Sequence, residues 1–195
     1  TAETQKLHYQ LPEAPEGYEI KYNGTDYEQV IDTDGTIYRP ITNVTVKASF
    51  KITSKTDSTE YAFKEFEVAV PGTMTAAENA NAAPTILPEL REWVGGTGSF
   101  AASSAKRVVY SDDSLKAMAE EFASDFQVIT GVKLSVSKGT SAAAGDIFFT
   151  LTTDTTKGLQ DEGYLIDAKG DKITVTAEQV AGANWGGKTI LQGMK

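Results

Sequence analysis

Between positions 44 and 53, apolar and polar side chains alternate without a break. The apolar members of this run are Val44, Val46, Ala48, Phe50 and Ile52, and each is followed by a threonine, a lysine or a serine. A period of two places these apolar side chains on one face of a strand, and a strand with one wet face is typical of an antiparallel sheet. The first part of the chain is therefore predicted to be β-structure.

A second strand is predicted over residues 61–70, but the phase of its apolar positions changes along the run. These positions are odd first and even afterwards: Tyr61, Phe63, Phe66, Val68 and Val70. Because a slip of one residue moves side chains to the other face, this strand needs a β-bulge near residues 64–65 or a change of its buried face.

Short strands and turns fill the rest of this part. Two further strands are predicted next to turn-forming dipeptides: 18–22 beside Asn23-Gly24, and 36–38 beside Asp34-Gly35. No helical pattern precedes residue 73, so residues 1–72 are predicted to form a small β-sandwich. Residues 73–85 are small and polar and contain a proline, which is typical of a linker.

The clearest helical pattern of the chain starts at residue 115. Its apolar residues recur at intervals of three and four: Leu115, Met118, Ala119, Phe122, Phe126 and Ile129. Ser111-Asp112-Asp113 offers an N-cap, and Gly131 ends the pattern. A closing helix is predicted from residue 176 or 177. Its glycines at 182, 186 and 187 would each cost about 1 kcal/mol in an ordinary helix, which indicates close packing on a sheet.

Five strands are predicted around these two helices. They cover residues 107–110, 132–136, 146–151, 164–169 and 172–177. Lys169-Gly170-Asp171 joins the last two as a tight hairpin. Residues 86–195 are therefore predicted to form an α+β domain.

Composition excludes several kinds of site. The chain has no cysteine and one histidine, His8, which excludes a disulfide scaffold, a Cys-ligated or His-x-x-x-His zinc site and a thiol nucleophile. Its 18 Lys+Arg against 27 Asp+Glu give a net charge of −9, which argues against a nucleic-acid surface. No run approaches the ~18 apolar residues of a membrane span. We therefore predict no metal, no cofactor, no nucleic-acid partner and no membrane span.

Three stretches in the second part carry a resemblance to a known family. They are Ile86-Leu87-Pro88-Glu89-Leu90-Arg91-Glu92-Trp93 with Gly95-Gly96-Thr97-Gly98-Ser99-Phe100, then Asp161-Glu162-Gly163-Tyr164-Leu165-Ile166, then Gly182-Ala183-Asn184-Trp185-Gly186-Gly187-Lys188-Thr189-Ile190-Leu191-Gln192. In this order they resemble the α/β domain that precedes the catalytic barrel of family-20 glycoside hydrolases, the β-N-acetylhexosaminidases and lacto-N-biosidase-like enzymes. The last stretch is shared by family-84 hydrolases, whereas Trp93 with Gly95-Gly96 favours family 20.

Three stretches in residues 9–72 resemble a bacterial immunoglobulin-like module that is often placed ahead of such enzymes. They are Ala14-Pro15-Glu16-Gly17-Tyr18, Asp32-Thr33-Asp34-Gly35 and Val68-Ala69-Val70-Pro71-Gly72. The two resemblances imply an immunoglobulin-like β-sandwich over 1–72, a linker over 73–85 and a pre-barrel domain over 86–195. They also imply that the pre-barrel domain is zincin-like, with a mostly antiparallel sheet and two helices.

The resemblance also implies where the chemistry occurs. In family 20 an Asp-Glu pair acts in a (β/α)8 barrel, and the substrate's own acetamido group is the nucleophile. A barrel needs about 250 residues, for which this chain has no room. The chain is therefore predicted to be the non-catalytic N-terminal part of a secreted or cell-surface bacterial enzyme, with the missing barrel as its partner. No residue is assigned as catalytic, cofactor-binding or metal-binding.

Several residues invite a functional interpretation, and for most a structural one is preferred. The adjacent Asp161 and Glu162 match the pre-barrel motif rather than the catalytic one, and are predicted to lie in a solvated turn. His8 is predicted to be an exposed tail residue. The segment 95–98 lacks the Lys-Ser/Thr of a phosphate-binding loop and is interpreted as a flexible turn. Trp185 is predicted to pack on the sheet.

Alternatives to the support role remain open. The β-module is a candidate glycan-binding or adhesion module, with Tyr22, Tyr27 and Tyr38 as its candidate contacts. A zincin-type hydrolase is disfavoured because the helix at 115–129 lacks His-Glu-x-x-His. If a barrel is missing, we expect an exposed apolar patch on the closing helix that includes Ile190 and Met194.

Overall fold

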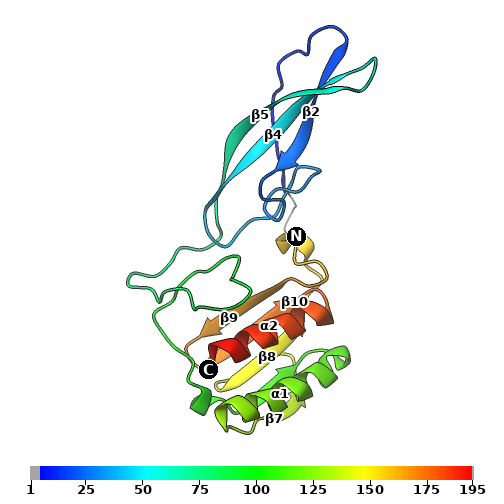
Figure 1. The fold of residues 1–195 in the computed structure, drawn as a ribbon. Coiled ribbons are helices and arrows are strands. Elements are labelled where there is room, and N and C mark those ends of the chain that lie inside the picture. The colour runs from blue at the N-terminus through cyan, green and yellow to red at the C-terminus, as the bar shows by residue number, and fades with distance from the viewer. Residues whose placement is uncertain (1–4, 195) are drawn as a thin grey trace. The chain divides into compact units, whose positions relative to one another are not determined.

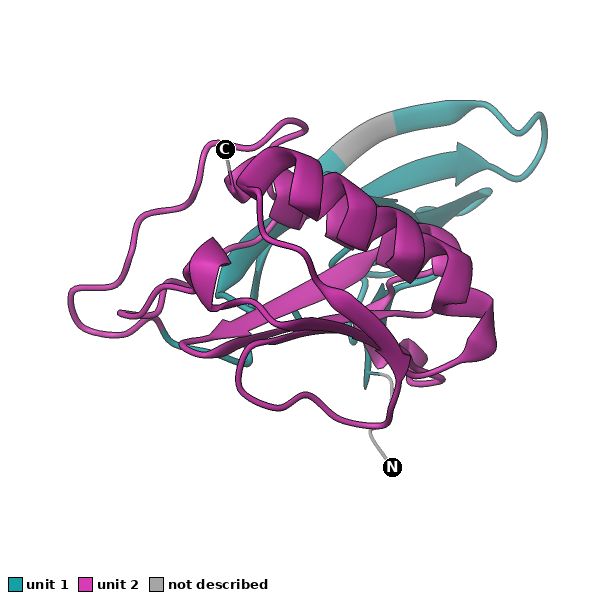
Figure 2. Ribbon diagram, turned by 90° about the horizontal axis from the view of Figure 1, so that it is seen from below, with its two compact units in different colours: residues 1–75 teal, residues 76–195 magenta. Residues whose placement is uncertain are grey.

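The computed structural model describes residues 5–194, and at positions 62 and 63 the backbone only. The chain divides into two compact units, residues 1–75 and residues 76–195 (Figure 2). Residues 71–101 contain no helix or strand. Neither of the two α-helices in the described region is long and apolar enough to cross a membrane.

The first unit is all β. Its strands are β1 (Gln5–Lys6), β2 (Tyr18–Thr25), β3 (Thr36–Ile37), β4 (Val44–Ser54) and β5 (Glu60–Val70). The strands β2, β4 and β5 form one antiparallel sheet in the order β2-β4-β5 (Figure 1). The short strands β1 and β3 pair with each other. An immunoglobulin-like sandwich is not confirmed, because the described residues outside the three long strands contribute only two strands of two residues each.

The alternation in β4 has the expected consequence. Val46 and Ala48 are buried while Thr45 and Lys47 between them are exposed. The β-bulge in β5 also exists, but at Ala62 rather than at residues 64–65, since Lys51 pairs with Phe63 and Ile52 with Tyr61. The extra residue puts Tyr61 on the same face as the even-numbered residues of β5. The side chain of Phe63 lies outside the described parts.

The second unit contains one five-stranded sheet and two α-helices. Its elements are η1 (Ala102–Ser104), β6 (Arg107–Tyr110), η2 (Asp113–Leu115), α1 (Lys116–Thr130), β7 (Ser135–Lys138), β8 (Asp146–Leu151), η3 (Thr155–Lys157), β9 (Tyr164–Lys169), β10 (Lys172–Ala177) and α2 (Val180–Gly193). The strand order is β7-β6-β8-β10-β9, and the two helices lie side by side over one face (Figure 1).

The prediction of a mostly antiparallel sheet is wrong. The pairs β6–β7, β6–β8 and β8–β10 are parallel, and only β9–β10 is antiparallel. The reason is the connection between strands. Helix α1 carries the chain back across the sheet between β6 and β7, which makes them parallel, whereas the tight turn at Gly170 forces β9 and β10 to be antiparallel.

Local sequence signals set the ends of α1. The side chain of Asp112 accepts a hydrogen bond from the backbone N–H of Ser114 ahead of the helix. Gly131 ends it in the left-handed conformation, with φ of 75°. Helix α2 begins at Val180, three or four residues later than predicted, because β10 continues through Ala177.

The core of the second unit lies between the helices and the sheet. Its largest fully buried side chains are Phe126, Phe149, Leu115 and Ile147. Phe122 and Phe149 meet edge to face with ring centroids 5.1 Å apart. Helix α1 is therefore held on the sheet by specific aromatic contacts as well as by the burial of apolar surface.

Candidate functional site

The glycines of α2 explain how closely this helix packs. A Cβ atom added at Gly182 would collide with the carbonyl oxygen of Gly163, and one added at Gly186 with the side chain of Val175 on β10. At Gly187 it would lie 3.2 Å from the ring of Phe122 on α1. The close approach that the three glycines predicted is therefore confirmed, and it involves the strand motif at 161–166 as well as the sheet.

Trp185 does not pack on the sheet as predicted. Its side chain is 49% exposed. Each helix residue turns the direction of the side chain by about 100°, and the neighbouring Gly186 and Gly187 face inward, so Trp185 is directed outward. Ile190, predicted to be part of an exposed patch, is buried, and Met194 packs partly covered against the core. The large apolar residues that are exposed on the two helices are Trp185 and Val128.

Gln192, the last residue of the closing motif, fastens the first motif to α2. Its side-chain Nε2 donates to the carbonyl oxygen of Leu87 over 2.8 Å, and its Oε1 accepts from the N–H of Leu87 over 3.1 Å. One amide side chain thus pairs with the backbone as a strand would. Two motifs that are 105 residues apart in sequence are joined by these bonds.

We expect Gln192→Ala to release the segment at Leu87 while the unit stays folded. Loss of the two bonds should cost about 1 kcal/mol, because Leu87 is exposed and water can replace them. Hydrogen exchange of the Leu87 amide should become faster in this variant. Gln192→Glu keeps the acceptor for that amide and should preserve part of its protection; equal protection in the wild type and Gln192→Ala would contradict the assigned role.

The glycine segment 95–98 is held by its carbonyl oxygens. Those of Gly95 and Gly96 accept from the backbone N–H groups of Ala77 and Asn81, and that of Gly98 accepts from the Asn81 side chain. Trp93 donates its indole N–H to the carbonyl of Asn81. The structure therefore ties this segment to residues 77–81 through its carbonyl oxygens.

The second motif is connected to α2 by a partly buried hydroxyl contact. The Tyr164 hydroxyl lies 2.6 Å from the hydroxyl of Thr189. Asp161 and Glu162, just before this strand, are in the exposed turn at 160–162. The motif residues at 163, 164, 189 and 192 thus meet along α2, while the carboxylates beside them face solvent.

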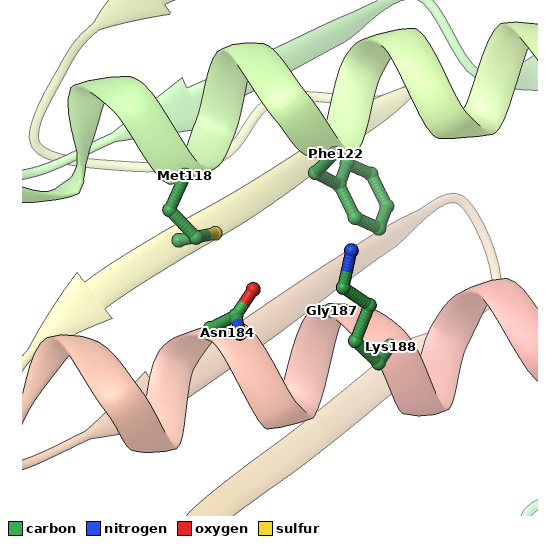
Figure 3. Close-up of a pocket in the computed structure, with 5 residues that line it drawn as sticks. All are labelled: Met118, Phe122, Asn184, Gly187 and Lys188. Carbon is green, nitrogen blue, oxygen red and sulfur yellow. The ribbon is translucent and has the colours of Figure 1, made fainter.

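A small depression separates the outer sides of the two helices (Figure 3). It is lined by Met118, Phe122, Asn184, Gly187 and Lys188, and it leaves no room for a water molecule. Lys188 spans it and donates to Glu121 over 2.8 Å and to Asp125 over 2.9 Å. These two carboxylates raise the pKa of Lys188, so the ammonium stays charged and links α2 to α1.

Asp146 is the most deeply buried carboxylate among the described residues of the second unit. Arg107 donates to it twice, from Nε over 2.9 Å and from Nη2 over 2.6 Å, and the N–H of Ala143 donates over 2.8 Å. The hydrogen bonds from Arg107, more than its charge alone, hold the pKa of Asp146 below its usual value. Both oxygens of this carboxylate accept hydrogen bonds from Arg107, which links β6 to β8.

The lowered pKa predicts how stability depends on pH. Because the folded-state pKa of Asp146 lies below the unfolded value of about 3.9, its stabilisation is complete above about pH 5 and is lost as the pH falls through the folded-state pKa. Asp146→Asn should lower the stability at pH 7 by about 2 kcal/mol and flatten the loss below pH 5. Urea unfolding from pH 3 to 7 checks this; parallel pH curves for the two proteins would contradict it.

The other predicted residues lie in the first unit. His8 is exposed just after β1. Tyr22 lies in β2 on the apolar face of the sheet, and its hydroxyl donates to the carbonyl of Asp32. Tyr27 packs against the small core of Val30, Ile31, Val46 and Val70. Within residues 5–194, no group of three or more His, Asp or Glu side chains is placed to hold a metal ion.

Comparisons with known proteins agree with the motifs of the second unit. Residues 83–195, more than half of the chain, match the family described as glycosyl hydrolase family 20, domain 2. Lacto-N-biosidase of Bifidobacterium bifidum is 30% identical over 109 residues, which are 56% of this chain and 10% of the biosidase. The chain thus spans about a tenth of the length of this relative.

Two solved structures match parts of the chain at low identity. A GH20 exo-β-N-acetylglucosaminidase from Vibrio harveyi, in complex with N-acetylglucosamine, is 18% identical with a TM-score of 0.43, and the match covers 75% of this chain and 22% of that one. A GH138 enzyme targeting pectin rhamnogalacturonan II is 24% identical with a TM-score of 0.35, and the match covers 45% of this chain and 10% of that one.

Proposed function

This chain belongs to the family of glycosyl hydrolase family 20, domain 2, and we propose that it is the non-catalytic N-terminal part of a bacterial β-N-acetylhexosaminidase. In this proposal residues 86–195 support the catalytic barrel of the same polypeptide. Residues 73–85 link this domain to the β-unit, which acts as an immunoglobulin-like spacer. The enzyme would act outside the cell. Residues 5–194 themselves contain no (β/α)8 barrel.

The observation that carries the support role is the joining of the motifs along α2. The residues that mark the family bind one another: Gln192 holds Leu87, Thr189 meets Tyr164, and Gly182 admits the backbone of Gly163. The charged side chains of Asp146 and Lys188 likewise form ion pairs within the unit. A rigid domain whose distinctive residues serve its own packing is suited to holding a neighbour in place.

Trp185 is the surface residue that this proposal needs. An aromatic side chain that is 49% exposed on a rigid helix is a contact surface for another domain, and Val128 on α1 is a second exposed apolar residue of the helical layer. The predicted docking patch on α2 is thereby moved from Ile190 and Met194 to the outward side of the helix.

Two measurements test the proposal. The 195-residue chain, incubated with p-nitrophenyl N-acetyl-β-glucosaminide, should release no nitrophenol, and clear hydrolysis would refute the support role. In the longer polypeptide that carries a barrel, Trp185→Ala should lower the thermal midpoint of the whole enzyme while leaving that of the 195-residue chain nearly unchanged. Tyr61→Ala changes a similarly exposed aromatic residue in the other unit and is the matched control. It should change the thermal midpoint of the longer enzyme no more than that of the 195-residue chain.

A further inference from the structure

One half of the apolar face of the three-stranded sheet is aromatic and only partly covered. Toward the start of β4, the aliphatic half of this face is buried beneath Val30 and Ile31. Toward the other end, the pairings Tyr22 with Phe50 and Ala48 with Phe66 place aromatic rings on the same face. Tyr61 joins them because the bulge at Ala62 brings it opposite Ile52.

The rings on this face contact one another in fixed orientations. Tyr9 stacks on Tyr22 with centroids 6.0 Å apart and meets Phe50 edge to face at 4.9 Å. Phe50 meets Phe66 at 5.7 Å, and Tyr61 meets Tyr18 at 5.8 Å. These contacts preorganise a surface that we call the aromatic platform, made of Tyr9, Tyr18, Tyr22, Phe50, Tyr61 and Phe66.

The size of the platform limits what it can bind. Tyr9, Tyr61 and Phe66 are 49, 46 and 49% exposed. An aromatic side chain carries roughly 200 Å² of surface, so these three leave about 300 Å² open. A stable protein partner needs about 800 Å² on each side. The platform is therefore too small for a second copy of the chain or another protein, and it suits a small ligand.

A hydrogen-bond donor lies beside the rings. Lys64 pairs with Phe50 in the sheet register, so its side chain leaves from the same face, and its Nζ lies 5.6 Å from the centroid of Phe66. No carboxylate of the described residues forms an ion pair with Lys64. The ammonium can therefore donate to a ligand hydroxyl while the rings contact an apolar face.

We propose that the aromatic platform binds a neutral oligosaccharide of β-linked pyranoses. The faces of such sugars carry C–H groups with partial positive charge, which complement the negative faces of aromatic rings. Their hydroxyls stay in water or accept from Lys64, so an open surface is sufficient. The net charge of −9 disfavours an anionic glycan. Of the predicted glycan contacts, only Tyr22 belongs to the platform, since Tyr27 packs on the small core.

The experiment titrates the ¹⁵N-labelled 195-residue chain with triacetylchitotriose and, separately, with cellotriose. The first sugar is chosen because of the proposed function, and the second tests the surface without it. Amide shifts should change in β2, β4 and β5 around the platform. Phe66→Ala and Tyr61→Ala should each weaken binding about tenfold, which is the loss of one ring contact. Trp185→Ala, in the other unit, should leave the affinity unchanged.

The outcomes separate this inference from the support role. Binding of either sugar at the platform, lost in the two variants, supports it, and binding of cellotriose alone would remove only the link to N-acetylhexosamine. Shift changes elsewhere, or none with either sugar, would overturn it. So would sedimentation showing a dimer that Phe66→Ala dissociates, because a second copy would then occupy the surface. If Phe66→Ala fails to fold, Phe66→Leu keeps an apolar side chain, removes the ring and should weaken binding similarly.

Discussion

Replacing Gly182 by alanine should destabilise the second unit by about 3 kcal/mol, although the same change in an exposed helix would stabilise it by about 1 kcal/mol. The sign reverses because the added methyl group would collide with a backbone carbonyl, that of Gly163. A flexible side chain could turn away, but this carbonyl cannot. Gly163 is itself held in the turn by its N–H bond to Leu159, and it lies too close to Leu159 to accept a side chain.

Gly193 provides the matched control in the same helix. Nothing lies within 4 Å of a Cβ atom added there, so Gly193→Ala should be neutral or stabilise by less than about 1 kcal/mol. Both tryptophans of the chain, Trp93 and Trp185, are in the second unit, so urea unfolding followed by their fluorescence reports on this unit alone. Similar midpoints for the two variants would show that α2 can move away from the strand motif at small cost.

The contrast between these two glycines indicates what the sequence could predict. Their number and spacing in α2 indicated close packing, since glycine is costly in a helix without such a reason. The partner of Gly182 could not be predicted, because Gly163 is distant in sequence and its carbonyl reaches α2 only in the folded unit. The bonds between Gln192 and Leu87 could not be predicted for the same reason.

Elements with strong local signals were predicted well. The period of the apolar residues, the cap at Asp112 and the stop at Gly131 placed α1 within one residue at each end. The tight turn at Gly170 placed the hairpin of β9 and β10. Strand direction in the rest of the sheet was predicted wrongly, because it depends on where each crossover returns the chain, which no local pattern records.

The candidate surfaces were harder to predict than the fold. Trp185 was expected to be buried because large apolar side chains usually are, but the inward side of α2 is occupied by small residues that allow close approach. The aromatic platform could be predicted only in part from the sequence. Its strand residues alternate as expected, whereas the contribution of Tyr9 depends on a segment without regular structure that crosses the sheet.

Truncating Phe126 to alanine should have the largest effect on stability, about 4 kcal/mol. Its side chain is fully buried between α1 and the sheet and meets Phe122 with ring centroids 5.9 Å apart. The loss combines the transfer energy of the ring with that of the cavity it leaves, because the surrounding strands cannot close around it. A domain of this size has about 5–15 kcal/mol in total, so the variant should unfold at much lower urea concentration.

Val128 and a smaller truncation at position 126 make this prediction specific. Val128 lies two residues further along α1 and is 83% exposed, so Val128→Ala should change stability by less than about 0.5 kcal/mol. Phe126→Leu keeps most of the apolar volume and should cost about 1.5 kcal/mol, which still gives a folded protein if the alanine variant does not fold. Because the core of the second unit is separate from the small core around Val46, the amide signals of the first unit should stay unchanged in all three variants. If Phe126→Ala is no less stable than Val128→Ala, the packing of α1 on this sheet is not as the structure describes.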